Sequence, residues 1–291
     1  MVEFLRNFFR LTRPLSNIKN VAIVSLAFYL SQSPLNWVLF VSGTLSLSCI
    51  FSSLYAYNTL CDAKLDIHNN NKKHYAQALA YFGGKKSFSI CIFLAAVGLI
   101  IGFFINIYFV VSLLFLLVIG FLYSSPFTRF KEKIGLDVLF GASLTFLVRF
   151  IASWFIFTIS FPPLLPMLGL VFLKNGGYLL YKGYDRPYLQ GLNIKNSITF
   201  FSEKKIFAVS LTFFLLSILC FVATCINSTY GKIAFLGSLP FAFLWFSIFF
   251  VVPIAVQYLL FFKMVRIEAR YVRGFGFSLL LLLIVGILII W

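Results

Sequence analysis

Three side chains that can bind a metal ion recur at steps of four residues, where a long apolar stretch of the chain ends. They are Asn58, Asp62 and Asp66, in a chain of 291 residues that has only eight acidic residues. On an α-helix, residues four apart lie on one face. Two carboxylates and an amide on one face supply the hard oxygen ligands that suit Mg²⁺. The spacing therefore predicts a Mg²⁺ site and, with it, chemistry on a phosphorylated substrate.

A simpler interpretation is that Asp62 and Asp66 only solvate or cap the end of a helix. Carboxylates stabilise helix N-termini, whereas these two lie at a C-terminal end, where the helix dipole disfavours them. An uncompensated pair at that end needs a cation, so the metal interpretation is favoured. Lys72 and Lys73 follow closely, and cations beside a metal-bound carboxylate pair suit a phosphate. Ordinary loop charge explains these two lysines equally well.

A second polar stripe interrupts a later apolar stretch, with steps of four, four and three residues between its members. The members are Lys174, Tyr178, Lys182 and Asp185. Charged residues inside a membrane segment usually face the interior of the bundle or a wet cavity. Lys182 could instead extend to the membrane surface. Asp185 could complete a metal site opposite the first group.

Arg149 lies well inside another apolar stretch. A buried arginine needs an anion or a polar partner, and both a phosphate and a structural bond to a neighbouring helix satisfy that need. Asp137, which precedes Arg149 in the same stretch, could be a metal ligand or the partner of Lys131 or Lys133.

The elements that must position these residues are transmembrane helices. The chain is 61% hydrophobic and 11% charged, with a mean hydropathy of +0.99. A soluble domain has about a quarter of its residues charged, and several apolar runs here reach the roughly 20 residues that cross a bilayer. We therefore expect an all-α polytopic membrane protein that forms one domain over residues 1–291. The predicted spans are 18–34, 36–60, 87–105, 107–124, 135–158, 164–184, 206–226, 234–262 and 275–291.

The basic residues between these spans indicate the orientation. Lysine and arginine concentrate in the connections 61–86, 125–134, 185–205 and 263–274, whereas the alternate connections hold only Lys232. This asymmetry predicts that the N-terminus and the candidate site face the cytoplasm. Residues 1–17 are basic and amphipathic, which fits a helix on an anionic membrane surface. We attribute the net charge of +16 to topology and anionic lipid rather than to nucleic acid.

Taken together, these residues resemble the UbiA superfamily of intramembrane prenyltransferases. Members have nine helices around a central cavity, and two Asp-rich signatures bind Mg²⁺ and diphosphate. The first signature, N-D-x-x-D-x-x-x-D, resembles Asn58, Asp62 and Asp66, with Thr59 in place of the first aspartate. The second signature is reduced to the segment 182–185, which has one acid. The resemblance implies that the cavity opens toward the cytoplasm.

Within the superfamily, the chain is most similar to the branch that includes decaprenyl-phosphate phosphoribosyltransferase. That branch opens with R-P-x-x-W-x-K-N, which residues 13–20 resemble with Asn17 in place of tryptophan. Its fifth helix has a Tyr-Ser…Lys opening and a late Leu-Arg, which are similar to Tyr123-Ser124, to Lys131 or Lys133, and to Val148-Arg149. The segment 182–184 is a partial match to the end of its sixth helix.

The branch resemblance implies an enzyme, a Mg²⁺-dependent transferase that moves phosphoribose from phosphoribosyl pyrophosphate to a polyprenyl phosphate. Asn58, Asp62 and Asp66 would be catalytic, and Asp185 would join them as a metal ligand. The candidate phosphate contacts are Lys19, Lys72, Lys73, Arg149, Lys182 and Tyr184.

Two alternatives use the same residues. In the first, a prenyl group moves from a prenyl diphosphate to an aromatic or lipid acceptor. In the second, the chain binds or carries a polyprenyl lipid without turnover, which the loss of acids at Thr59 and after Asp185 keeps open.

Overall fold

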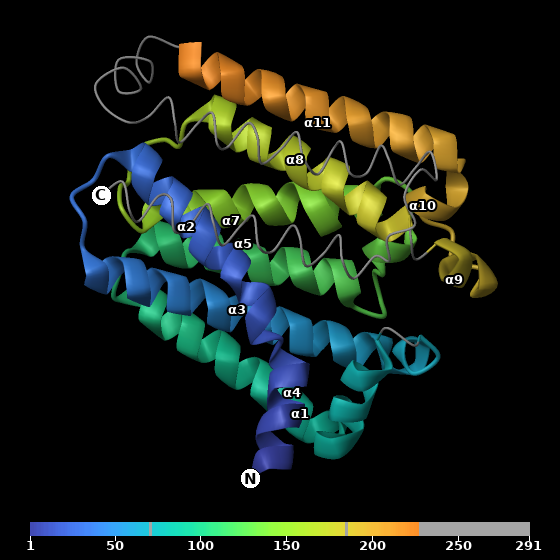
Figure 1. The fold of residues 1–291 in the computed structure, drawn as a ribbon. Coiled ribbons are helices and arrows are strands. Elements are labelled where there is room, and N and C mark those ends of the chain that lie inside the picture. Colours follow the sequence, from blue (N-terminus) through green and yellow to red (C-terminus); the bar gives the residue numbers. More distant parts are fainter. Residues whose placement is uncertain (70–71, 184–185, 227–291) are drawn as a thin grey trace. The chain divides into compact units, whose positions relative to one another are not determined.

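The chain folds into helices throughout the part that the structure describes. The structure, a computed structural model, describes residues 1–69, 72–183 and 186–226, and every regular element in these ranges is helical (Figure 1). The α-helices are α1 (Val2–Thr12), α2 (Ile18–Ser31), α3 (Trp37–Asp66), α4 (Lys73–Phe103), α5 (Ile107–Ser124), α6 (Leu136–Val138), α7 (Leu144–Phe155), α8 (Leu164–Gly183), α9 (Arg186–Gly191), α10 (Ser197–Phe200) and α11 (Glu203–Ile226). The short 3₁₀ and π elements are η1 (Pro14–Asn17), η2 (Phe130–Glu132) and η3 (Leu139–Ser143).

The chain divides into two compact units. The first unit comprises Met1–Gly141 and Val148–Ser160, and the second comprises Ala142–Leu147 and the described residues that follow Ser160. All the residues of the first candidate metal site belong to the first unit, and the stripe on α8 belongs to the second.

Apart from residue 184, the first seven predicted spans fall within the described residues, and each contains an apolar helix. Five helical segments are long and apolar enough to cross a membrane: Trp37–Asp66, Lys73–Phe103, Ile107–Ser124, Leu136–Phe155 and Glu203–Thr224. In α8 the apolar part, Leu164–Leu180, is shorter, and α2 has only 14 residues. The two last predicted spans, 234–262 and 275–291, lie outside the described residues.

The connection predicted over residues 61–86 is largely helical instead. The helix α3 continues to Asp66, and α4 begins at Lys73. The first part of α4 is amphipathic, with Ala76, Ala78 and Phe82 buried, so it has no long apolar run that would mark it as a span. The predicted connection 185–205 also contains two short helices, α9 and α10.

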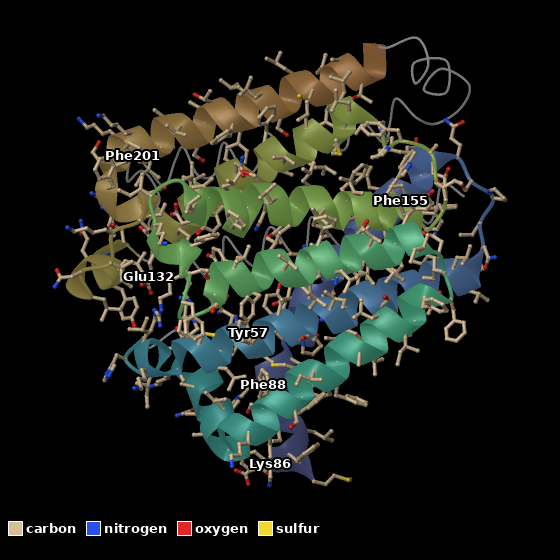
Figure 2. The ribbon with its side chains drawn as sticks, turned by 180° about the vertical axis from the view of Figure 1, so that it is seen from behind. Tyr57, Lys86, Phe88, Glu132, Phe155 and Phe201 are labelled. Carbon is tan, nitrogen blue, oxygen red and sulfur yellow. The ribbon has the colours of Figure 1, made fainter. Side chains whose placement is uncertain are left out.

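Gly83 divides α4 into two parts. Its backbone has φ 76° and ψ 161° inside an otherwise helical segment, a conformation that glycine adopts readily and other residues do not. The kink separates the amphipathic start of α4 from its apolar remainder. Lys86 and Phe88, which Figure 2 labels, are both exposed just after the kink.

The long helices α3 and α4 lie side by side (Figure 1), and small residues and serine hydroxyls form the contact between them. The Ser46 Oγ donates to the carbonyl of Gly98 at 2.7 Å, and the Ser53 Oγ donates to the carbonyl of Cys91 at 2.8 Å. A Cβ at Gly98 would come within 3.0 Å of the backbone oxygen of Ser46. Small residues allow such close approach between membrane helices. The resulting contacts with α4 fix the position of α3, including its polar end.

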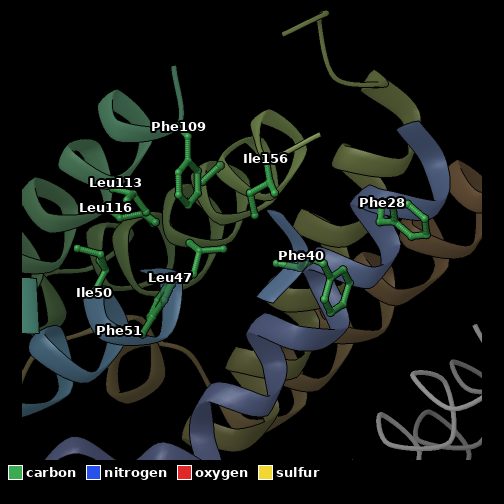
Figure 3. Close-up of a cluster of buried hydrophobic side chains, with 11 residues drawn as sticks. Phe28, Phe40, Leu47, Ile50, Phe51, Phe109, Leu113, Leu116 and Ile156 are labelled. Carbon is green, nitrogen blue, oxygen red and sulfur yellow. The ribbon is translucent and has the colours of Figure 1, made fainter. Parts of the chain in front are cut away.

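The core of the first unit packs against the other side of α3. Figure 3 shows this cluster, to which α2, α3, α5 and the segment around α7 contribute. Its labelled members are Phe28, Phe40, Leu47, Ile50, Phe51, Phe109, Leu113, Leu116 and Ile156. The core therefore holds α3 from several directions, and the polar end of α3 extends beyond it.

In the second unit, α8 and α11 form a similar pair. The Ser210 Oγ donates to the carbonyl of Gly176 at 2.8 Å, and the Ser217 Oγ donates to the carbonyl of Gly169 at 2.7 Å. Both units therefore join two long helices through serines that are seven residues apart.

The N-terminal segment forms a helix with two different faces, as its amphipathic sequence predicts. On one face, Leu11 is fully buried in a cluster with Ala56, Ala78 and Phe82. On another, Phe9 is exposed. The helix α1 ends at Arg13, which has a left-handed backbone conformation with φ 51°, and this turn directs the Arg13 side chain toward the end of α3.

Candidate functional site

Asn58, Asp62 and Asp66 lie on one face of the last turns of α3. The helix runs unbroken from Trp37 to Asp66, so the four-residue spacing becomes an alignment of side chains along its axis. The sequence prediction of a helix at this place is confirmed. The three side chains nevertheless have quite different surroundings.

Asn58 is joined to the end of α5. The Ser124 Oγ donates to the Asn58 Oδ1 at 2.9 Å. The neighbouring Tyr57, labelled in Figure 2, stacks on Phe121 of α5 with ring centres 5.4 Å apart. These contacts hold the amide oxygen in place on the α3 face.

Asp62 forms an ion pair with Lys131, which lies in η2, between α5 and α6. The two side chains are only 13% and 11% exposed. The sequence offers Asp137 as a metal ligand or as a partner for Lys131 or Lys133, and the structure pairs Lys131 with Asp62. Asp137 is fully buried within α6.

Asp66 is buried, and its carboxylate has no direct partner among the residues that the structure describes. The residue is 5% exposed, and within the described residues its carboxylate accepts no hydrogen bond and forms no ion pair. Lys72, Arg13 and Lys131 lie close enough to act on its charge, as does the like charge of Asp62. A buried carboxylate normally needs a partner, so Asp66 has the surroundings of a ligand for an added cation.

Thr59 and Arg13 form a contact that the sequence did not predict. The Arg13 Nη2 donates to the Thr59 Oγ1 at 2.9 Å, and Thr59 is fully buried. The Arg13 guanidinium also lies over two rings, with its carbon 3.6 Å from the centre of Tyr75 and 5.4 Å from that of Tyr55. Thr59 stands where the family signature has an acid, and Arg13 supplies a positive charge at that position. The segment that opens with Arg13-Pro14 was the available signal for this contact.

The predicted phosphate-binding lysines of the first unit lie in two places. Lys72 precedes α4 and acts on the charge of Asp66, and Lys73 is exposed on the first turn of α4. Lys19 is exposed on the first turn of α2. The amides Asn17 and Asn20, on either side of Lys19, are buried against α3. The structure therefore brings Lys72 to the acidic pair and places Lys19 on the outside of α2.

Arg149 is buried in α7, where its guanidinium stacks on an aromatic ring of α3. The guanidinium carbon lies 3.5 Å from the centre of the Phe51 ring, and Arg149 also interacts with Tyr55. Tyr55 therefore contacts both Arg13 and Arg149. The sequence allowed Arg149 either a phosphate partner or a structural contact with a neighbouring helix. The contacts with Phe51 and Tyr55 are structural contacts of this kind, and phosphate binding by Arg149 stays a proposal.

The polar stripe of α8 lies in the second unit. The Lys182 Nζ is 5.9 Å from the centre of the Tyr178 ring, as expected for residues one helical turn apart. Lys174 and Lys182 are both partly buried. Tyr184 and Asp185, which were predicted as phosphate and metal ligands, lie outside the described residues.

The donor set of the first unit fits a hard divalent cation. It consists of the two carboxylates of Asp62 and Asp66 and the amide oxygen of Asn58, and oxygen is the ligand that Mg²⁺ requires. Within the described residues, no three His, Cys, Asp or Glu side chains gather as a metal-binding group. The two carboxylates would thus be completed by the amide, by water or by substrate phosphate, which is the usual way in which proteins bind Mg²⁺.

Comparison with known proteins gives one family match and several structural matches. The sequence model of the UbiA prenyltransferase family matches residues 21–280. No curated protein matches the sequence.

Three solved structures illustrate the structural similarity. A UbiA homologue from Archaeoglobus fulgidus bound to GPP and Mg²⁺ has 18% identity and a TM-score of 0.74, over 98% of this chain and 99% of that chain. An apo UbiA homologue from Aeropyrum pernix K1 has 14% identity and a TM-score of 0.76, over 94% and 97%. A structure described as digeranylgeranylglyceryl phosphate synthase in membranes has 15% identity and a TM-score of 0.67, over 98% and 99%. At these identities the likeness shows the fold alone.

Proposed function

The chain belongs to the UbiA prenyltransferase family, and from this premise we propose that it is a Mg²⁺-dependent transferase that acts on a polyprenyl phosphate. The proposed donor is phosphoribosyl pyrophosphate, and the site faces the cytoplasm. The observation that carries the proposal is the buried Asp66 carboxylate, which has no partner of its own within the described residues and lies beside Asp62, Lys72 and Arg13. This arrangement favours a cation and its attached phosphates.

The proposed reaction forms one bond and breaks one. An oxygen of the lipid phosphate attacks the anomeric carbon of the ribose, and the bond from that carbon to pyrophosphate breaks. Asp62, Asp66 and Asn58 would hold Mg²⁺, with Asp185 as a further candidate ligand. When bound, Mg²⁺ would supply positive charge that stabilises the departing pyrophosphate.

The basic side chains have a complementary role in this proposal. Lys72 and Lys73 would bind the pyrophosphate, because Lys72 lies next to the acidic pair and Lys73 follows it on the first turn of α4. Lys19, Arg149, Lys182 and Tyr184 are the further candidates for phosphate contacts. Arg149 would approach a phosphate with its guanidinium plane already oriented by Phe51.

Two sequence features support phosphoribose rather than another group. Residues 13–20 resemble the opening segment of the polyprenyl-phosphate phosphoribosyltransferase branch, and Tyr123-Ser124 resembles the start of its fifth helix. In the structure, Arg13 and Ser124 both contact α3 at the candidate site, at Thr59 and Asn58 respectively.

A second candidate function is prenyl transfer from a prenyl diphosphate to an aromatic or lipid acceptor. The specific observation in its favour is that the similar structures from Archaeoglobus fulgidus contain GPP or DMAPP together with Mg²⁺. The same metal site would then assist cleavage of the bond between the allylic carbon and the diphosphate. Aromatic faces would stabilise the allylic cation that results.

One assay separates the candidates. Purified protein in lipid nanodiscs is incubated with Mg²⁺ and polyprenyl phosphate plus labelled phosphoribosyl pyrophosphate, or with a labelled prenyl diphosphate plus candidate acceptors. We expect labelled ribose phosphate in the lipid product. Prenyl transfer alone would reject the first proposal and support the second. Binding of the lipid without transfer in either arm would support a carrier.

A further inference from the structure

We infer that Lys131 is a built-in counterion of the metal site, which neutralises Asp62 until a divalent cation and a phosphate arrive together. This inference rests on the proposed function, because it concerns the same acidic pair. It assigns a positioning role to a residue that lies outside the predicted set of site residues.

The ion pair between Lys131 and Asp62 is shielded from solvent. Lys131 and Asp62 are 11% and 13% exposed, whereas both partners in the Glu3–Arg6 pair are more than half exposed. Exposed ion pairs contribute little and exchange readily with solvent, whereas shielded charges need a counter-charge at all times. Asp62 therefore has a firm partner when no metal is bound.

The residues around Lys131 hold its backbone in place. It lies in η2, and the preceding Arg129 has a left-handed backbone with φ 43°. Arg129 pairs with Glu132, which Figure 2 labels, and its Nη2 approaches the carbonyl of Cys61 at 3.5 Å. Phe130 packs on Phe140 with ring centres 4.6 Å apart. The backbone around Lys131 is therefore fixed beside α3, and the long lysine side chain is the part that can move.

Lys131 and a bound metal ion would compete for the same carboxylate charge. The Lys131 charge acts on both Asp62 and Asp66, and so it occupies the place of positive charge that a metal ion would take. A divalent cation bound to both carboxylates would repel the ammonium group, because like charges at this distance disfavour each other. Metal binding and the Lys131–Asp62 contact are therefore mutually exclusive.

The consequence is coupling between metal and phosphate. A Lys131 ammonium group that is displaced from Asp62 loses the Asp62 charge, and an anion that enters with the metal can take the place of that charge. Metal alone should thus bind weakly, and an anion that accepts the ammonium group should strengthen metal binding. By linkage, the metal should strengthen anion binding by the same factor.

The test measures Mn²⁺ binding to the full protein in nanodiscs by electron paramagnetic resonance, without substrate turnover. Wild type is compared with Lys131→Met and with Lys133→Met, a matched control whose ammonium lies 5.3 Å from the Phe130 ring instead. We expect Lys131→Met to bind Mn²⁺ alone about tenfold more tightly than wild type. Lys133→Met should match wild type. Equal or weaker binding by Lys131→Met would overturn the inference.

Inorganic pyrophosphate provides the second arm, with its own affinity for Mn²⁺ taken into account. It should tighten Mn²⁺ binding to wild type about tenfold and have a smaller effect on Lys131→Met. The variant Asp62→Asn should lose Mn²⁺ binding. If it binds Mn²⁺ as wild type does, the metal lies elsewhere, and the proposed metal site fails. If Asp62→Asn loses Mn²⁺ but Lys131→Met equals wild type, only the counterion inference fails.

A measurement on wild type alone covers the case in which Lys131→Met does not fold. Acylation of lysine amines is followed by mass spectrometry, with the ratio of Lys131 to Lys133 as the readout. Mn²⁺ should raise this ratio, because it frees the Lys131 ammonium from Asp62. An unchanged ratio at saturating Mn²⁺ would contradict the inference.

Discussion

Asp62 and Asp66 are one helical turn apart on α3, yet their environments are different. Asp62 has an ion-pair partner in Lys131, and Asp66 is buried without a direct partner within the described residues. Both acids should therefore contribute to metal binding, but their contributions to stability should differ. This difference allows function and folding to be separated by mutation.

We predict that Asp62→Asn and Asp66→Asn each reduce transferase activity by at least about a hundredfold, the scale of a lost electrostatic stabiliser of a transition state. Only Asp62→Asn should strongly destabilise the protein, by about 2 kcal/mol, because it removes the carboxylate that pairs with the shielded Lys131 ammonium group. Activity assays and unfolding in mixed detergent micelles measure the two effects. Glu203→Gln, at an acid that is 80% exposed, is the control and should change neither.

If Asp66→Asn destabilises the protein as much as Asp62→Asn does, then Asp66 has a structural partner, and its assignment as an open ligand position is wrong.

Thr59 provides a second test at the residue scale. Its hydroxyl accepts from Arg13 at 2.9 Å and donates to the carbonyl of Tyr55 at 3.0 Å. Thr59→Val should cost about 1–2 kcal/mol of unfolding free energy, because a shielded guanidinium donor loses its acceptor. Thr44→Val is the matched control, since the Thr44 hydroxyl donates the equivalent bond to the carbonyl of Phe40 at 2.7 Å and has no other bond to the described part of the chain. Equal losses for both variants would show that the Arg13 contact contributes nothing.

At the scale of elements, the kink in α4 joins two helices of different character. The part before Gly83 is amphipathic and packs on α1, and the part after it is apolar and packs on α3. A straight helix over the whole of α4 would direct one of these two faces away from its partner. The positive φ at Gly83 is therefore required by the packing on both sides.

We predict that Gly83→Ala destabilises the protein by about 1–2 kcal/mol, because a Cβ strains the backbone at φ 76°. Among the described residues, neither Gly83 nor the adjacent Gly84 has a neighbour within 4 Å of an added Cβ, and Gly84 has no positive φ. Gly84→Ala should thus be neutral or stabilising, as alanine favours a helix. Unfolding in detergent measures the stability of the two variants, and the difference between them reports the backbone strain at Gly83. A Gly83→Ala variant as stable as wild type would show that α4 can straighten.

At the scale of the whole molecule, the distribution of charge defines an expected orientation in the membrane. The connections expected on the cytoplasmic side hold the basic residues, including Lys86 after the α4 kink. Ser160, in the turn after α7, is expected on the opposite side and is exposed. The proposed cytoplasmic site depends on this orientation, because soluble phosphorylated substrates are then available to it.

We predict that Ser160→Cys reacts with a membrane-impermeant maleimide in intact cells, whereas Lys86→Cys reacts only after permeabilisation. Both are placed in a background in which the natural cysteines are replaced by alanine. The reason is that positively charged connections remain on the cytoplasmic side. The reverse labelling pattern would place the acidic pair outside the cytoplasm and would contradict the proposed orientation.

The sequence alone was sufficient for the helices and for the local arrangement of the acids. Long apolar runs predicted the spans, and the span expected at 107–124 coincides with α5. The common face of Asn58, Asp62 and Asp66 follows from helical periodicity, which is a local property. The amphipathic start of α4 was assigned wrongly to a loop, because a short surface helix lacks a long apolar run.

The partners of the acids depended on tertiary structure. Lys131 lies 69 residues from Asp62 in the chain, and the sequence offered both Lys131 and Lys133 as possible partners for Asp137. The packing of η2 against the end of α3 selects Lys131 and directs it to Asp62. Arg13 likewise reaches Thr59 only because α1 ends in a left-handed turn above α3. Periodicity determines which residues share a helical face, whereas contacts between distant segments depend on how helices pack and where their connections turn.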